Sequence, residues 1–147
     1  MATWAIPDST AVLEEFTPQE KAVLEAIQSA TTPLASILGR AADRMRGACA
    51  SGGYEVDATS GTIPPGFYSD VIAIARWNWL TALPAAAQSL RTDARKDAAE
   101  KAEKRLERVS MRELAVESPT TGYYASYGNW RNTQNRFATT IETTLTV

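Results

Sequence analysis

Apolar residues recur at helical spacing along most of this chain, and the pattern divides into a series of helices. A capping box at residues 17–20, with proline at the first helical position, predicts a helix that runs to about residue 30. The start signal repeats at residues 32–33, and the glycine pair 52–53 supplies a left-handed stop. The apolar face of the first helix is Val23, Leu24 and Ile27. The apolar stripe of the second is Leu34, Ile37, Leu38, Ala41, Ala42 and Met45.

Two further helices follow a loop at residues 53–66 that is dense in turn-forming residues. The helix that starts at Phe67 is apolar on nearly all sides and is closed by Pro84, which predicts a central helix buried by its neighbours. We expect its two tryptophans, Trp77 and Trp79, to lie in the core. A long charged helix then spans about 92–109, with a narrow seam of small residues that lets it approach a partner closely. The seam is Ala94, Ala98, Ala102, Leu106 and Val109.

The character of the chain changes after residue 118. Residues 120–147 have almost no helical periodicity, but the stretch from Phe137 to Val147 alternates in the manner of a β-strand. A single strand is not stable alone, and only fragments of the 53–63 loop offer a partner strand. We therefore expect the tail to complete its structure by adding a strand to a neighbouring subunit or partner.

The tail also carries aromatic residues for which the helices leave no obvious core. Tyrosine and tryptophan are favoured anchors at protein interfaces, so we expect docking, with a mobile tail as the alternative. The predicted interface residues are Tyr123, Tyr124, Tyr127, Trp130, Arg131, Phe137, Ile141 and Leu145.

Together these elements predict a mainly α protein, a small bundle of about four helices with an extended C-terminal tail that ends in a β-strand. A length of 147 residues and a mass of 15.9 kDa fit one domain. We expect a lead-in over residues 1–16 with a helical turn or two after Asp8, a helical domain over 17–117, and the tail over 118–147.

Composition argues against most enzyme classes. The chain has no histidine, which removes histidine-dependent nucleophile systems and the common zinc sites. Its one cysteine, Cys49, lies beside alanines and is expected to be a helix-packing residue. A metal-dependent hydrolase needs clustered carboxylates, and the candidates are expected to be solvated helix charges: Glu14, Glu15, Asp93 and Asp97. We therefore expect no enzyme, cofactor or metal.

Nucleic-acid and membrane binding find little support either. The formal net charge is -2, and the charges of the 91–112 segment are mixed, without interleaved aromatic residues for stacking. The glycine-bearing loop 52–66 lacks a phosphate-loop motif and a calcium-loop spacing, so we expect a surface or intersubunit loop. There is no stretch long and apolar enough to cross a membrane, nor a signal peptide, which favours a cytoplasm-like compartment and no membrane partner.

The segment from about Pro33 to Glu117 resembles the head-tail connector (adaptor, or head-completion) proteins of long-tailed bacteriophages. The resemblance rests on the order and spacing of short features and not on a catalytic fingerprint. They are Ala42-Asp43-Arg44-Met45-Arg46-Gly47 at the end of a helix, Ile63-Pro64-Pro65 closing a loop, the central helix 70–80 with Ala75-Arg76-Trp77, the acid/base-rich helix 95–109, and Leu114-Ala115-Val116-Glu117.

The resemblance implies a structural virion protein, made in the host cytoplasm, whose copies form a ring under the portal at the capsid vertex, usually of about twelve copies. The expected partners are the portal protein, neighbouring copies, and a downstream neck or tail-completion protein. Genome DNA would pass through the ring without sequence-specific binding. The alternatives are a DNA-packaging accessory, which would need a continuous basic face, or another small helical protein-interaction module.

Overall fold

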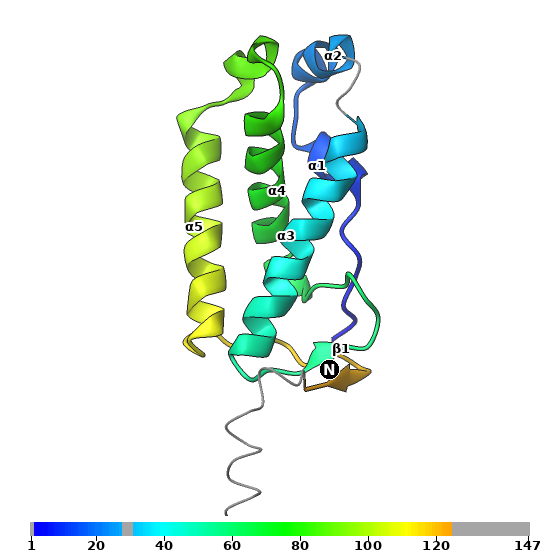
Figure 1. The fold of residues 1–147 in the computed structure, drawn as a ribbon, viewed down its shortest axis with the longest axis vertical. Coiled ribbons are helices and arrows are strands. Elements are labelled where there is room, and N and C mark those ends of the chain that lie inside the picture. Colours follow the sequence, from blue (N-terminus) through cyan, green and yellow to red (C-terminus); the bar gives the residue numbers. More distant parts are fainter. Residues whose placement is uncertain (1, 28–30, 125–147) are drawn as a thin grey trace, which may run out of the picture.

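The computed structural model describes residues 2–27 and 31–124, which fold into a helical bundle resting on a small two-stranded sheet (Figure 1). The three long helices α3, α4 and α5 pack against one another, α1 packs against α3 and α4, and α2 lies at one end of the bundle beside the turn that follows α4. The α-helices are α1 (Ser9–Glu14), α2 (Pro18–Ala26), α3 (Thr31–Ser51), α4 (Tyr68–Ala82) and α5 (Asp93–Ser110). The 3-10 turns are η1 (Pro65–Phe67) and η2 (Ala85–Leu90), and the strands are β1 (Val56–Asp57) and β2 (Gly122–Tyr123).

The helix start signals read from the sequence are confirmed. In the capping box of α2, the Thr17 hydroxyl accepts a hydrogen bond from the Glu20 N–H (3.3 Å), and the Glu20 carboxylate accepts one from the Thr17 N–H (2.9 Å). Asp8 caps α1, which is the short helix expected after that residue. Within α2, Leu24 is buried, but Val23 is 38% exposed, so the expected apolar face is narrower than the sequence suggested.

The stripe on α3 and the glycine stop that follows it are also confirmed. The stripe residues Leu34 to Met45 are buried, except for Ile37, which packs at the edge of the core. Gly53 adopts a φ of +77°, a left-handed conformation that favours glycine. Gly52 lies so close to α5 that a Cβ atom would stand 2.4 Å from the Val109 carbonyl oxygen. A side chain at position 52 would therefore separate the ends of α3 and α5.

Helix α4 is the central helix that the sequence predicted, but its two tryptophans differ. Trp79 is fully buried, whereas Trp77 is only half-buried. Residue 77 lies two positions before residue 79, about 200° around the helix, so both side chains cannot face the same core. The core role expected of both residues thus belongs to Trp79.

The buried seam of α5 is shifted from the expected one. The residues that pack inward are Ala99, Ala102, Leu106 and Val109, while Ala94 is exposed and Ala98 is half-buried. A helix turns about 100° per residue, so a strict four-residue spacing rotates about 40° per step away from any one face. Three such steps back from Leu106 carry Ala94 out of the interface.

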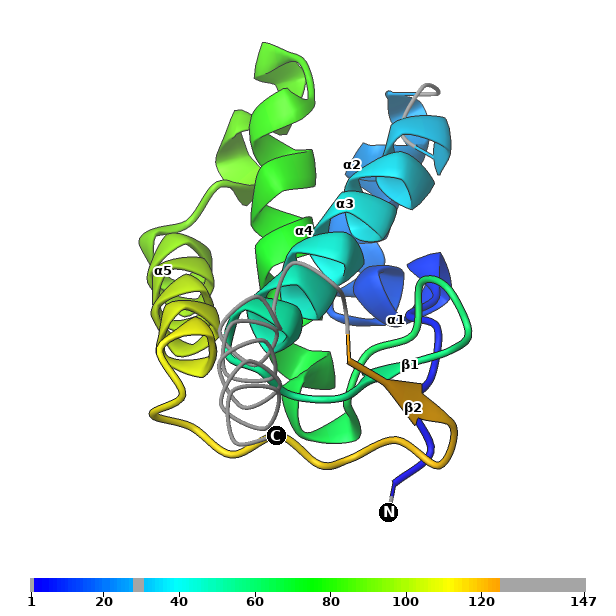
Figure 2. The same cartoon turned by 60° about the horizontal axis from the view of Figure 1, so that its bottom comes forward.

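The sheet at the base joins three distant parts of the chain (Figure 2). Strands β1 and β2 pair antiparallel, with Val56 opposite Tyr123 and Asp57 opposite Gly122. Isolated bridges join Ala2 to Pro119 and Ala5 to Ile63. The start of the expected tail therefore pairs with the chain's own loop. The partner strand, β1, lies in the 53–63 loop, where the sequence offered a possible strand fragment.

The residues expected to form a lead-in and a tail contribute to the same core as the helices. Trp4, Val12 and Phe16 from the first 16 residues belong to the main hydrophobic cluster, and Pro119 is buried. The strand expected over Phe137 to Val147 lies outside the described residues.

A candidate interaction surface at the base of the bundle

The loop between α3 and α4 is held by the side chain of one arginine on α3. The Arg46 guanidinium donates hydrogen bonds to the carbonyl oxygens of Asp57 (2.7 Å), Thr62 (2.9 Å) and Thr59 (3.1 Å). It also donates to the Thr62 hydroxyl at 2.9 Å. Backbone carbonyls that turn inward need such donors, and the planar guanidinium supplies several from a single side chain. Arg46 therefore sets the shape of the loop that carries β1.

A buried aspartate connects this loop to the C-terminal segment. The Asp57 carboxylate accepts hydrogen bonds from the hydroxyls of Thr62 (2.8 Å) and Thr121 (2.9 Å). Burial alone would raise the pKa of Asp57, but the hydrogen bonds from Thr62, Thr121 and the backbone N–H groups of Thr59 and Ala58 outweigh it and lower the pKa. The ionised carboxylate thus stabilises the join between β1 and β2.

Three further hydrogen bonds close the base. The Trp4 indole Nε1 donates to the Glu117 carbonyl at 2.9 Å. The Tyr54 hydroxyl donates to the Leu114 carbonyl at 2.7 Å, and the Ala58 N–H donates to the Thr121 carbonyl at 2.8 Å. Residues far apart in the sequence are therefore held together in a platform that includes the chain up to Tyr124.

The platform presents two of the predicted interface residues to solvent. Tyr123 is 51% exposed and Tyr124 is 56% exposed, so two adjacent aromatic side chains face solvent. In the part of the chain that the structure describes, β2 pairs with β1 only, so its outer edge is open to a further strand. The other predicted interface residues lie outside the described residues: Tyr127, Trp130, Arg131, Phe137, Ile141 and Leu145.

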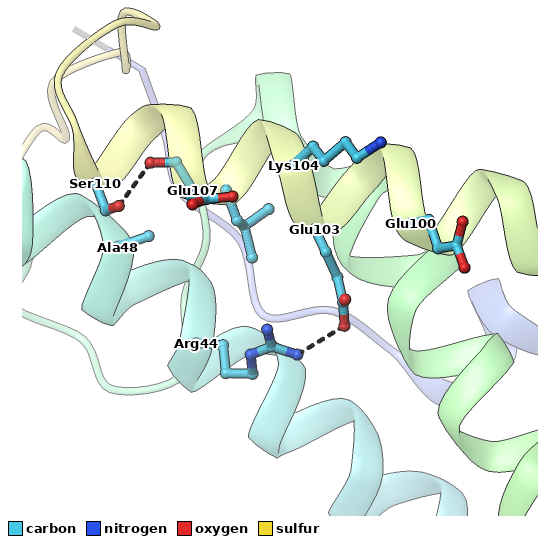
Figure 3. Close-up of a pocket in the computed structure, with 8 residues that line it drawn as sticks. Arg44, Ala48, Glu100, Glu103, Lys104, Glu107 and Ser110 are labelled. Atoms are coloured by element: carbon cyan, nitrogen blue, oxygen red, sulfur yellow. Dashed lines mark hydrogen bonds and ion pairs between the residues drawn. The ribbon is translucent and has the colours of Figure 1, made fainter.

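A shallow groove of about 490 Å³ lies between α3 and α5 (Figure 3). Glu100, Glu103 and Glu107 follow one side of it on α5, and Arg44 on α3 bridges to Glu103 at 3.0 Å. The Arg44 and Glu103 side chains are 54% and 45% exposed, so this ion pair contributes at most about 1 kcal/mol. The groove is lined by charged, alanine, leucine and serine side chains without an activated nucleophile.

Several charges of α5 pair with other helices, which the sequence did not reveal. Arg95 binds Glu20 at 2.8 Å, and its guanidinium lies 4.8 Å above the Phe16 ring. Arg105 binds Asp70 at 2.6 Å. Burial raises the pKa of Asp70, although the Arg105 charge opposes the shift. These contacts dock α5 onto α2 and α4. Some of the charged side chains of α5 therefore hold helices together and do not simply face solvent.

The groups that could carry chemistry are dispersed in the structure. Burial raises the pKa of the Cys49 thiol to about 12, which makes it a poor nucleophile. Glu15 pairs with Arg76 at 3.3 Å. Among the described residues, no three of the aspartate, glutamate and cysteine side chains are grouped so that they could hold a metal ion. No helix in the described ranges is long and apolar enough to cross a membrane.

Comparison with known proteins adds no relative. The chain matches no protein-family model, no curated protein and no solved structure.

Proposed function

We propose that this chain is a structural virion protein, a head-tail connector whose copies form a ring under the portal and link the capsid vertex to the tail. Its partners would be the portal protein, neighbouring copies of itself, and a downstream neck protein. It would act without a catalytic group or a cofactor, and the genome would pass through the ring without being read.

The observation that carries this proposal is the platform at the base of the bundle. Its backbone is fixed by Arg46 and Asp57, it exposes Tyr123 and Tyr124, and the open edge of β2 can take a further strand. A rigid surface with aromatic anchors loses little conformational entropy on binding, as an assembly protein requires. The mainly helical body that rests on the platform is consistent with the helical bundle that the resemblance implies.

The test is binding of the purified chain to portal rings, or to tail-less DNA-filled capsids, of the virus that encodes it. The sample is sedimented and imaged, and we expect a ring retained at one vertex. A chain that ends after Tyr124 keeps β2 and the Thr121–Asp57 hydrogen bond, so the helical signal in its far-UV circular dichroism should be kept. We expect its retention to be weakened, because it lacks the predicted interface residues beyond Tyr124, and to be lost when Tyr123 and Tyr124 are replaced by serine as well. A chain that ends before Thr121 would lack both β2 and the Thr121–Asp57 hydrogen bond. Its failure to bind could then result from a disrupted fold and not from the loss of the interface.

Two results would contradict the proposal. Failure of the full chain to bind either particle would remove the connector function. Binding of DNA in place of the portal would favour a packaging accessory.

A further inference from the structure

One side of α5 is acidic. Glu103 pairs with Arg44 at 3.0 Å, so this side of the helix faces α3. Side chains three or four residues apart lie on the same side of a helix, and Glu100 and Glu107 are such neighbours of Glu103. These three exposed glutamates, the acidic flank, border the groove of about 490 Å³ between α3 and α5 (Figure 3). They outnumber the basic residues that line the groove, which are Arg44 and Lys104.

Another side of α5 is basic. Arg105 pairs with Asp70 at 2.6 Å, so this side of the helix faces α4. Lys101 lies four residues before Arg105 and Arg108 lies three residues after it, which places all three on the same side of the helix. We call these three exposed residues the basic flank. A single helix therefore presents opposite charges toward its two neighbours.

Both flanks keep charges that the chain does not pair. Among the described residues, Glu100 and Glu107 make no ion pair, and neither does Lys101. The pairs that the flanks do make within the chain, through Glu103 and Arg108, join side chains that are about half exposed. The separation of the two signs on the surface thus remains available to a partner.

Each flank also offers apolar surface. Ala48 and Leu106 line the groove beside the acidic flank. Trp77 is half-buried and lies seven residues after Asp70, close to two full turns, so it is on the side of α4 that the basic flank borders. Tryptophan and arginine are enriched among the residues that dominate binding at protein interfaces. The two flanks therefore have the composition of contact surfaces, with opposite charge.

We infer that a second copy of this chain docks its basic flank against the acidic flank and groove of the first. Lys101 of the second copy then faces Glu100 and Glu107 of the first, and opposite charges meet across the contact. Because the two flanks are different surfaces of one molecule, the contact runs head to tail and closes into a ring when the rotation between copies permits. This inference rests on the proposed ring and names the surface that would hold its copies together.

The test reverses the charge of one flank at a time in the full chain. The acidic-flank variant carries Glu100→Lys and Glu107→Lys, and the basic-flank variant carries Lys101→Glu and Arg108→Glu. Sedimentation equilibrium, without any other virion protein, measures the self-association constant. Each variant should associate about tenfold or more weakly than wild type, because like charges then face each other. An equimolar mixture of the two variants should regain wild-type association, because each reversed flank again meets an opposite charge.

Controls separate this contact from folding and from net charge. None of the four substituted side chains pairs with another helix, so the melting temperature of both variants should stay within a few degrees of wild type. Glu14→Lys with Glu25→Lys changes the net charge as much as the acidic-flank variant does, on exposed residues of α1 and α2. That control should associate as wild type does. Raising the salt concentration should weaken wild-type association, since salt screens exposed charges.

The inference is overturned if wild type stays monomeric at its solubility limit, or if either flank variant associates as wild type does. It is also overturned if the mixture stays as weak as its components, or if the wild-type mass stops at two copies. A chain that self-associates as described but does not bind portal rings would keep this contact and remove the connector function. A chain that binds portal rings while both flank reversals have no effect would do the reverse.

Discussion

Replacing Arg46 with methionine should loosen the base of the molecule while leaving the helices in place. Methionine preserves the unbranched stem that packs along α3, but it removes all four hydrogen bonds to the residues of the loop. Three of the acceptors are backbone carbonyls, which have to find water or remain unpaired. A hydrogen bond to a charged group contributes about 1.5–3 kcal/mol, and bonds that share one partly exposed guanidinium do not add fully. We expect the free energy of unfolding to fall by about 2–4 kcal/mol.

The same helix supplies the control. Arg44 lies half a turn earlier, is 54% exposed, and makes a single ion pair with Glu103. Arg44→Met should lower the free energy of unfolding by less than about 1 kcal/mol. Urea denaturation followed by far-UV circular dichroism gives both values under identical conditions.

Hydrogen exchange then locates the effect. In Arg46→Met, the amides of Ala58 and Ile63, which donate to the Thr121 and Ala5 carbonyls, should lose protection more than amides in the middle of α4. Equal destabilisation by the two arginine substitutions, within about 0.5 kcal/mol, would refute the assignment of Arg46 as the loop anchor. Unchanged protection at the base would refute it independently.

Three shorter predictions follow from burial and ionisation. Trp79→Ala should lower the free energy of unfolding by roughly 3–5 kcal/mol and Trp77→Ala by clearly less, so equal losses in urea would contradict the packing described. The pKa of Asp57 is lowered in the folded state, so its stabilisation is present above the unfolded pKa of about 3.9 and is lost as pH falls through the folded value. Asp57→Asn should therefore reduce stability at neutral pH and flatten its acid dependence; unchanged acid slopes would argue against the role of the carboxylate. Because burial raises the pKa of Cys49 to about 12, iodoacetamide should label it only on unfolding, and rapid labelling of the native chain would show that this site opens.

Local signals in the sequence were sufficient for most helix starts. The capping box at Thr17 and the glycine stop at Gly53 depend on neighbouring residues, and both are present in the structure. The end of α2 was predicted less well, because the helix ends at Ala26 and not at about residue 30. The central position of α4 could also be predicted, because a helix that is apolar on nearly all sides has few alternatives.

Features that depend on distant partners were not predictable in the same way. Arg46 belongs to the polar side of its helix by pattern, and nothing local indicates that it meets the carbonyl of Thr62. The prediction that Ala94 belongs to the buried seam of α5 was wrong. An alanine-rich, charged helix has several faces of similar polarity, and the helices that pack against it decide which face is buried. The partner of β2 is two residues long, too short to show alternation.

For the candidate site, the sequence predicted Tyr123 and Tyr124 as interface residues; the structure shows that both are exposed, and their interface role stays a prediction. Arg46 and Asp57, which hold the loop and join it to β2, were not predicted, because their partners are backbone carbonyls and hydroxyls brought together only by the fold.

The hydrogen bond from Trp4 to Glu117 joins residues 113 positions apart, and this separation determines the order in which the protein can fold. On the ribosome, Trp4 emerges early and has no carbonyl to bind until Glu117 follows it. The helices can therefore begin to pack during synthesis, whereas the Trp4–Glu117 hydrogen bond at the platform can form only after Glu117 has been made. A chain that stops short of Glu117 therefore lacks the Trp4 hydrogen bond and the finished platform.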